Sequence, residues 1–210
     1  MLFVLTGSSG SGKSAVLPGL AARVANLEPH DFDELGVPHG ASRRWRQEAT
    51  EEWTKCVVAS PANGGDTLIA GQTPIGEWLA VPSATELDGI AVCLLDVSDR
   101  IRATRLGQRA AGIGPGRTEL WHLLAWASWH RSHAADPQWR QDVIRQGSWE
   151  QMRWQRWQHW EHDDHRWDVV TLDTSVAPMD VTVEQLAHWI AERRDSHRAG
   201  TLGLAESWWT

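Results

Sequence analysis

Short apolar runs alternate with longer segments of helical periodicity along this chain of 210 residues. The run Ala91-Val92-Cys93-Leu94-Leu95 has no polar position, which is typical of a strand buried on both faces of a parallel sheet. Strands separated by helix-like stretches are the order expected when helices pack on both faces of such a sheet. The pattern therefore predicts an α/β fold with a five-stranded parallel sheet, whose strands are Leu2–Leu5, a weak one near Ala25–Pro29, Thr67–Ala70, Ile90–Asp96 and Asp168–Leu172.

Apolar positions spaced three and four residues apart predict the helices. Asp99 and Thr182 each precede such a pattern and are predicted to cap the helix that follows. The longest pattern is amphipathic, with breaks at Asp136-Pro137 and Gly147-Ser148. The predicted helices are Ala15–Val24, Arg100–Arg109, Thr118–His162 with those two breaks, and Val183–Arg194.

A glycine-rich turn with the pattern G-x-x-x-x-G-K-S joins the first strand to the first helix. Glycine lets backbone N–H groups converge on phosphate oxygens, because no Cβ is in the way, and the helix N-terminus adds partial positive charge. Lys13 is predicted to reach the β- and γ-phosphates, and the Ser14 hydroxyl to ligate Mg²⁺. The strand–turn–helix context predicts a site for a nucleoside triphosphate such as ATP, formed by Gly7, Ser8, Ser9, Gly10, Ser11, Gly12, Lys13 and Ser14.

Charge and cysteine content limit the partners and the compartment. Asp and Glu number 27 against 20 Lys and Arg, a net charge of −7, and no long basic run occurs, so no nucleic-acid partner is expected. Cys56 and Cys93 lack metal-ligand spacing, which indicates a reducing compartment without disulfides. No apolar run approaches the roughly 20 residues that cross a bilayer, and the first strand leaves no room for a signal peptide. We therefore expect a cytoplasmic protein with no membrane contact.

Tryptophan is the unusual component, because the chain has 15 Trp, no Tyr and only 2 Phe. The predicted helical segments that follow residue 118 contain two stripes of it, namely Trp121, Trp126 and Trp129 on one helix and Trp154, Trp157 and Trp160 on another. Stripes at such spacing are more often packing between helices than a ligand site. The alternative is an aromatic cap over a substrate pocket, suited to stacking on a ring or a sugar face.

Two carboxylates follow the second predicted strand, in the sequence His30-Asp31-Phe32-Asp33. Side chains two residues apart on an extended segment point the same way, and ligands of open α/β sheets bind at the C-terminal ends of the strands. We predict that Asp31 supports Mg²⁺ and that Asp33 binds the substrate and accepts a proton from its hydroxyl. A solvated loop with a helix cap is the alternative interpretation.

The phosphate loop, the Asp31-x-Asp33 pair and the segment Arg105-Leu106-Gly107-Gln108-Arg109 together resemble the P-loop small-molecule kinases. This group includes shikimate, gluconate and adenylate kinases and the chloramphenicol phosphotransferase type. The resemblance implies that Arg105 lies near the adenine, that Arg109 is a catalytic contact of the ATP phosphates, and that Thr174 belongs to the segment under the adenine. A planar guanidinium suits both arginine roles, because it stacks on a base and grips phosphate bidentately.

The same resemblance implies one P-loop kinase-like domain over residues 1–195. It covers residues 1–35, 66–76, 90–110 and 167–193, and leaves out 115–165. Within the domain we expect a lid over 100–117, hinged at its glycine-rich end, and a Trp-rich helical insertion over 118–165. The tail at 196–210 ends in Trp208-Trp209 and is expected either to be loose or to dock through those rings.

One position departs from the group. Related kinases often carry an acidic residue after strand three that supports the metal, where this chain has Gly71-Gln72, so Gln72 is expected to face the substrate. Asp96, which closes the fourth strand, is an alternative metal carboxylate if that strand lies beside the phosphate loop. We expect strand three to be the neighbour instead, which assigns the metal to Asp31 or Asp33.

Three functions share this phosphate loop. The preferred one is an ATP- and Mg²⁺-dependent kinase that transfers the γ-phosphoryl group to a hydroxyl of a small molecule, such as a nucleoside, sugar or antibiotic, and works as a monomer or homodimer. A nucleotide-dependent ATPase or switch module without such an acceptor is the main alternative. A kinase of nucleic-acid ends is disfavoured, because its acceptor groove should be basic.

Overall fold

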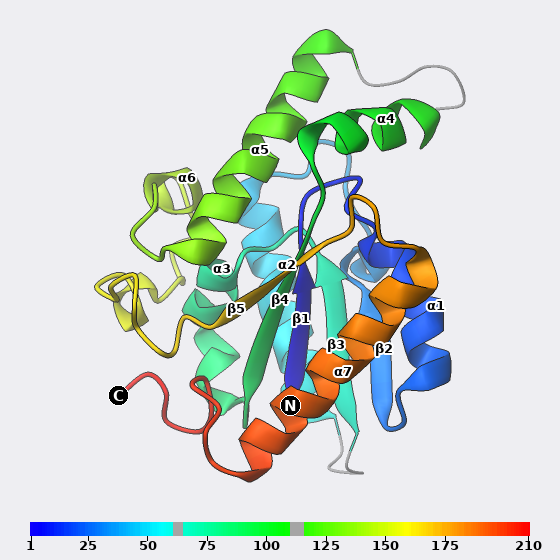
Figure 1. The fold of residues 1–210 in the computed structure, drawn as a ribbon. Coiled ribbons are helices and arrows are strands. Elements are labelled where there is room, and N and C mark those ends of the chain that lie inside the picture. The colour runs from blue at the N-terminus through cyan, green and yellow to red at the C-terminus, as the bar shows by residue number, and fades with distance from the viewer. Residues whose placement is uncertain (61–64, 110–115) are drawn as a thin grey trace.

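The computed structural model describes residues 1–60, 65–109 and 116–210. The described residues form a parallel sheet of five strands in the order β2-β3-β1-β4-β5, with helices on both faces (Figure 1). The predicted α/β fold class is therefore confirmed. The strands are β1 (Leu2–Thr6), β2 (Leu27–Asp31), β3 (Asp66–Gly71), β4 (Ile90–Asp96) and β5 (Val169–Asp173).

Helices alternate with these strands, as the hydrophobic pattern predicts. The α-helices are α1 (Lys13–Arg23), α2 (Arg43–Ala59), α3 (Ile75–Ala80), α4 (Asp99–Arg109), α5 (Arg117–Ala135), α6 (Asp142–Arg145) and α7 (Met179–Arg198). Short 3₁₀ helices are η1 (Phe32–Leu35), η2 (Pro82–Glu86) and η3 (Trp154–Arg156). Within the described ranges, no helix is both long and apolar enough to span a membrane.

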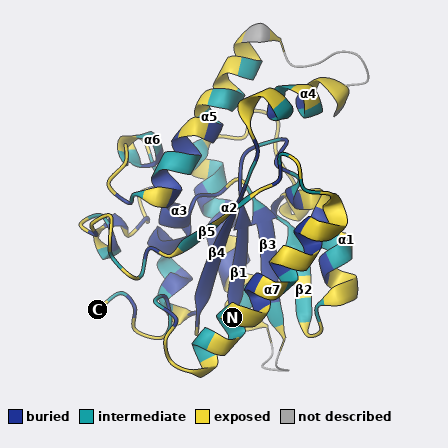
Figure 2. Ribbon diagram, in the orientation of Figure 1, coloured by how far each residue is buried: buried dark blue, intermediate teal, exposed yellow. Residues whose placement is uncertain are grey.

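Alternate side chains of the central strands pack into two separate hydrophobic cores, one on each face of the sheet. Leu2 and Val4 of β1 point to the face covered by α2 and α3, whereas Phe3 and Leu5 pack with α1 and α7. Figure 2 shows the sheet interior as buried and the outer helix faces as exposed. Because both faces are covered, the central strands read as continuous apolar runs, which is why the sequence reveals them.

The second strand begins two residues later than predicted, at Leu27, because Asn26 takes a left-handed conformation with φ of 57° and ends the preceding turn. β2 is an edge strand and none of its residues is fully buried. An edge strand can contain Pro29, since the missing N–H faces away from the ladder. These properties weaken its hydrophobic signal and explain the displaced prediction.

The predicted helix over Thr118–His162 is wrong beyond residue 135. α5 ends at the predicted Asp136-Pro137 break, and the chain then runs through turns that contain only α6 and η3. Trp154, Trp157 and Trp160 therefore do not form a stripe on a helix. Trp154 lies in η3, and the other two follow it in turns. Their spacing of three reflects successive turns that each return an indole to the core.

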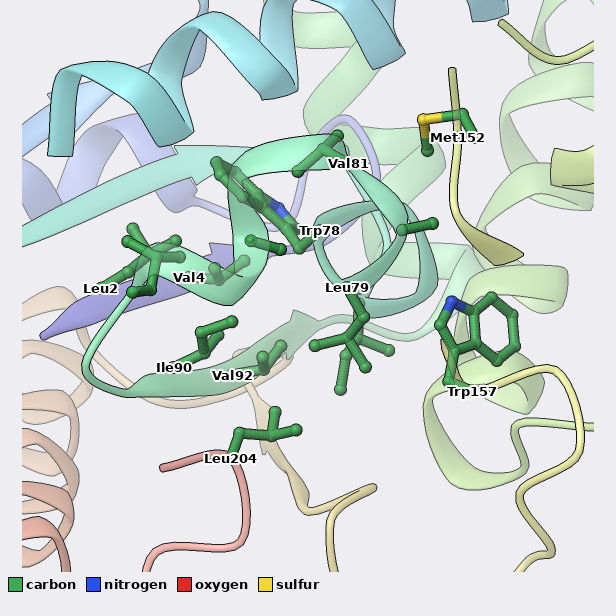
Figure 3. Close-up of a cluster of buried hydrophobic side chains, with 14 of the residues drawn as sticks. Leu2, Val4, Trp78, Leu79, Val81, Ile90, Val92, Met152, Trp157 and Leu204 are labelled. Carbon is green, nitrogen blue, oxygen red and sulfur yellow. The ribbon is translucent and has the colours of Figure 1, made fainter. Parts of the chain in front are cut away.

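Most of these indoles are core residues, which confirms packing as the main role of the Trp-rich segment. Trp157 is fully buried and donates its Nε1–H to the Gly76 carbonyl over 2.8 Å. A Cβ on Gly76 would lie 2.4 Å from the Trp157 ring, so glycine is required there for the ring to approach α3. Figure 3 shows Trp157 beside Leu79 of α3, together with the side chains from β1 and β4.

Two predicted helix caps lie inside helices instead. Thr182 is in the first turn of α7, where its hydroxyl donates to the Pro178 carbonyl over 3.2 Å, and Pro178 is the N-cap residue. Asp99 is the first residue of α4, and its carboxylate binds Arg131 of α5. In both cases the helix starts earlier than the apolar periodicity does, because its first residues are exposed.

The C-terminal segment docks against the fold. The Leu204 carbonyl accepts the N–H of Ile90 over 2.9 Å at the start of β4, and Trp208 is buried against Trp160 with ring centroids 5.9 Å apart. Of the two alternatives for this tail, docking through an aromatic ring is the one observed. The division into a domain over 1–195 and a tail over 196–210 stays a prediction.

The buried His133 of α5 predicts a stability that falls in acid. His133 is buried and stacks on Trp129 at 4.7 Å, and burial lowers its pKa from 6.5 to about 3. The unfolded chain therefore binds a proton at pH values where the folded chain does not, so unfolding becomes easier as the pH falls from about 6.5 towards 3. We expect the free energy of unfolding to fall by up to about 1.4 kcal/mol per pH unit for this group.

Urea unfolding between pH 5 and 7 measures this dependence. His133→Leu should flatten the slope whatever its effect on stability at pH 7, and His159→Leu at an exposed position is the matched control. An unchanged slope in His133→Leu would show that another group carries the proton.

Candidate functional site

The predicted phosphate loop connects β1 to α1 and depends on its glycines. Gly7, Gly10 and Gly12 have φ values of 149°, 85° and 101°, which residues other than glycine rarely adopt. A Cβ on Gly7 would also lie 2.3 Å from the Leu95 carbonyl of β4. The loop therefore turns tightly against the end of the sheet, with its backbone open to a ligand.

Lys13 and Ser14 begin α1 directly after this loop. Gly12 is the N-cap residue and has no side chain, so no side chain caps the first N–H groups of the helix. The buried Lys13 ammonium donates to the Ser8 carbonyl over 3.3 Å. The hydroxyls of Ser8 and Ser11 are buried and have no hydrogen-bond partner among the described residues. Two hydroxyls without hydrogen-bond partners, N–H groups that no side chain caps and the Lys13 ammonium make this loop suited to an anion with several oxygens.

Two arginines of α4 hold the outer side of the loop. Arg102 is fully buried, and its Nη1 donates to the Ser9 carbonyl over 2.6 Å. Arg105 donates to the Gly10 carbonyl over 3.2 Å and to the Thr174 carbonyl over 2.6 Å. The Thr174 hydroxyl in turn donates to the Ser11 carbonyl over 2.9 Å. Arg105 and Thr174, both predicted from the resemblance, therefore lie together against the loop, whereas the role of Arg102 was missed.

Asp96 lies at the end of β4, which flanks β1 on the side opposite β3. β3 is a neighbour of the loop strand, as expected, but β4 is its other neighbour. The expectation that β3 takes this place instead of β4 is therefore wrong, and Asp96 does end a strand beside the loop. One oxygen of Asp96 binds Arg102 at 2.7 Å and the other binds Arg131 at 2.6 Å. Both oxygens of this carboxylate are therefore engaged by guanidinium groups.

Arg102→Met should loosen the loop and destabilise the protein. The substitution removes the hydrogen bond to Ser9 and one of the two ion pairs of Asp96, a loss of about 1 to 3 kcal/mol, because Asp96 keeps its ion pair with Arg131. Urea unfolding measures the loss, and Arg100→Met, at an exposed position of the same helix, is the matched control. Equal stability of the two variants would contradict a structural role for Arg102.

The acidic pair occupies a corner where β2 enters η1. Asp31 caps η1: its carboxylate accepts the N–H of Asp33 over 3.1 Å, and Glu34 accepts the N–H of Asp31 over 2.9 Å. Asp33 therefore lies in a 3₁₀ helix, and the expectation that both carboxylates sit on one extended segment is wrong. Burial and the neighbouring Asp31 carboxylate raise the pKa of Asp33, while Lys13 lowers it.

Packing fixes this corner in place. Phe32 is buried between the two aspartates, and its carbonyl accepts the indole N–H of Trp53 over 3.0 Å. A Cβ on Gly71 would lie 2.7 Å from the Phe32 Cβ, so glycine at the end of β3 admits the ring. The packing of Phe32 thus sets the position of both aspartates. Nothing in the sequence pattern indicates this role of Phe32.

Loop and acidic corner open into one cavity of about 710 Å³ at the C-terminal ends of the strands. The cavity brings together most of the predicted site residues, namely Ser9, Gly10, Gly12, Lys13, Ser14, Asp31, Asp33 and Gln72. Trp126 of α5 also lines it, whereas Trp129 and Trp154 are in the core and Trp121 is exposed. The predicted aromatic cap is thus reduced to one indole of the Trp-rich segment.

Three residues of the cavity wall escaped sequence analysis: Arg43, Trp45 and Arg46 in the first turn of α2. A helix that precedes a parallel strand starts at the edge where the strands end, so its first turn faces the ligand crevice. Ser42, whose hydroxyl accepts the N–H of Trp45 over 3.2 Å, is the N-cap that could have located this turn.

The structure describes only the two ends of the predicted lid. α4 forms its first part, and α5 begins at Arg117, where the predicted lid ends. The side chain of Arg109 and the glycine-rich stretch from 110 to 115 lie outside the described residues. The roles expected for Arg109 and for the hinge therefore stay predictions.

Solved structures of kinases share this fold. The chain is similar to a sugar kinase from Janibacter sp. (17% identity, 90% of this chain and 94% of that one, TM-score 0.59) and to a gluconokinase from Sinorhizobium meliloti (16% identity, 95% and 96%, TM-score 0.57). A thymidylate kinase from Candida albicans follows at 14% identity, 93% and 92% coverage and a TM-score of 0.53. No family model and no curated protein matches the sequence. The chain has the fold of P-loop kinases, as the resemblance implied.

Proposed function

We propose that this protein is an ATP-dependent kinase that transfers the γ-phosphoryl group of ATP to a hydroxyl of a small molecule. One observation carries the proposal: a single cavity joins a phosphate loop to a pair of carboxylates and an aromatic wall. Binding a nucleotide alone would need only the phosphate loop. A phosphoryl acceptor needs a second binding site within reach of the γ-phosphate.

The phosphate loop fits the triphosphate of ATP. The backbone of Gly7 to Ser14 and the start of α1 supply N–H donors, and the hydroxyls of Ser8 and Ser11 supply two more. Lys13 offers a positive charge to the β- and γ-phosphates. Arg105 and Thr174 hold the loop from outside, and we propose that they border the adenine end.

Mg²⁺ is the metal that such a reaction uses, and the residues present fit it. The Ser14 hydroxyl and the Asp31 carboxylate line the same cavity and are oxygen donors, which Mg²⁺ prefers. When bound, the ion neutralises charge on the phosphates. The Asp31 carboxylate also caps η1, so the same group would serve both the start of that helix and the metal.

At the acceptor end, Asp33 and Gln72 would receive the substrate. Asp33 accepts the proton of the substrate hydroxyl while that oxygen forms a bond to the γ-phosphorus, and the bond from this phosphorus to the bridging oxygen of ADP breaks. A raised pKa makes Asp33 a stronger base than an ordinary aspartate. Arg109 would stabilise charge on the transferring group, and Gln72 would orient the acceptor.

The ATPase alternative needs a carboxylate beside the loop strand that is available to a metal. Asp96 is in the right strand, but Arg102 and Arg131 take both of its oxygens. The observation favours a structural role for Asp96 and therefore the kinase.

A screen for acceptor-dependent ADP release tests the proposal. Hydroxylated metabolites, nucleosides and antibiotics are added to protein and MgATP, and mass spectrometry identifies a product heavier by one phosphoryl group. ADP release that no acceptor increases would favour the ATPase.

A further inference from the structure

Trp126 and Arg46 both line the cavity and belong to a group of stacked side chains. The rings of Trp126 and Trp129 are stacked, with centroids 4.8 Å apart and planes 17° apart. The guanidinium carbon of Arg46 lies 5.0 Å from the centroid of Trp126. The Trp126 indole thus contacts both a second indole and a guanidinium, and of these two partners only Arg46 lines the cavity.

Glu77 binds this guanidinium by its edge. Arg46 donates Nε and Nη2 to the two carboxylate oxygens over 2.7 and 2.8 Å, and the Glu77 side chain is fully buried. Gln47 adds a third hydrogen bond to Glu77 over 2.9 Å. These contacts use Nε, Nη2 and one flat face of the guanidinium, and Arg46 is also a residue of the cavity wall.

The charges at this end of the cavity do not suit an anionic acceptor. Asp31 and Asp33 are negative, and Glu77 offsets the charge of Arg46. The other basic residues of the cavity wall are His122, Lys13, which we assign to the ATP phosphates, and Arg43, for which the described residues contain no carboxylate partner. Bound MgATP would add further negative charge, so a carboxylate on the acceptor would be repelled by more groups than attract it.

We infer that the acceptor is an uncharged molecule with a planar ring, which packs on the open face of Arg46 and against the indole of Trp45. The inference rests on the proposed kinase function and narrows its substrate class. Trp45 lies one residue before Arg46, lines the same cavity and is held edge-on by Phe32 at 6.1 Å. An acceptor whose ring packs on a guanidinium or an indole binds more tightly without carrying a charge itself.

Three probes that share the configuration of glucose at carbons 2 to 5 separate the aromatic ring from charge: glucose, phenyl β-D-glucoside and the open-chain gluconate. Adenosine and thymidine add two natural rings. Each is titrated by calorimetry into the protein with Mg²⁺ and a non-hydrolysable ATP analogue. We expect at least one ring-bearing probe to bind about tenfold more tightly than glucose, and gluconate to bind no better than glucose.

Arg46→Lys tests the flat face, because it keeps the charge beside Glu77 and removes the planar group. Arg46→Lys and Trp45→Leu should each abolish the tenfold tighter binding of the ring-bearing probe over glucose. Trp121→Leu, at an exposed position of α5, should keep that difference. If the ATP analogue binds and the ring gives no gain over glucose, or gluconate binds tightest, the inference is wrong and the kinase proposal stands. Failure of the ATP analogue to bind would contradict both.

Discussion

Lys13→Ala should reduce turnover by at least about 10²-fold and weaken the binding of MgATP. The substitution removes the one ammonium at the N-terminus of α1, where the loop backbone is held open for an anion. A preorganised charged donor in such a site is worth roughly this factor, because it meets the developing charge without reorganisation. Ser14→Ala should instead raise the Mg²⁺ concentration needed for half-maximal activity.

Calorimetry with MgATP and a steady-state assay with the acceptor found in the screen measure both effects. Lys55→Ala is the matched control, because Lys55 is exposed and, among the residues that the structure describes, forms ion pairs only with Glu51 and Glu52 of its own helix. The glycines, and not Lys13, set the loop conformation, so circular dichroism should show Lys13→Ala folded. Unchanged affinity and turnover in that variant would refute nucleotide binding at this loop.

Local features of the site could be predicted from the sequence because their chemistry is contiguous. The residues from Gly7 to Ser14 specify a loop whose φ values only glycine adopts readily, and the strand before it is a buried apolar run. The same holds for β4, whose predicted and observed bounds agree. The predicted and observed elements agree where neighbouring residues share one constraint, either burial on both faces of the sheet or a backbone conformation that requires glycine.

The rest of the site depends on contacts between distant residues. Arg102 reaches Ser9 across 93 positions of sequence, and Arg46 reaches Glu77 across 31, so neither pair has a periodicity to reveal it. The Trp-rich segment misled the helix prediction for a related reason. Each indole finds its own pocket, as Trp157 does at Gly76, and tertiary packing overrides a spacing of three that reads as a helix.

Asp33→Asn should lower kcat by about 10² to 10⁴ and leave MgATP affinity nearly unchanged. The amide keeps the shape of the side chain but accepts no proton at neutral pH, which removes general-base help of that size. No hydrogen bond or ion pair of the Asp33 carboxylate occurs within the described ranges, and its backbone N–H to Asp31 remains, so the melting temperature should hardly change. Because burial and Asp31 raise the pKa of Asp33, the acid limb of kcat/KM in the unmodified protein should lie above the ordinary aspartate value near 4.

Two further aspartates separate the possible roles. Asp31→Asn should raise the Mg²⁺ requirement, because it removes the carboxylate proposed for the metal. Asp96→Asn should mainly lower stability, since it weakens the ion pairs to Arg102 and Arg131. Full turnover in Asp33→Asn, together with abolished ATP hydrolysis in a folded Asp96→Asn, would reverse the assignment. The metal carboxylate would then lie at the end of β4, and the protein would be an ATPase whose cavity does not receive a phosphoryl acceptor.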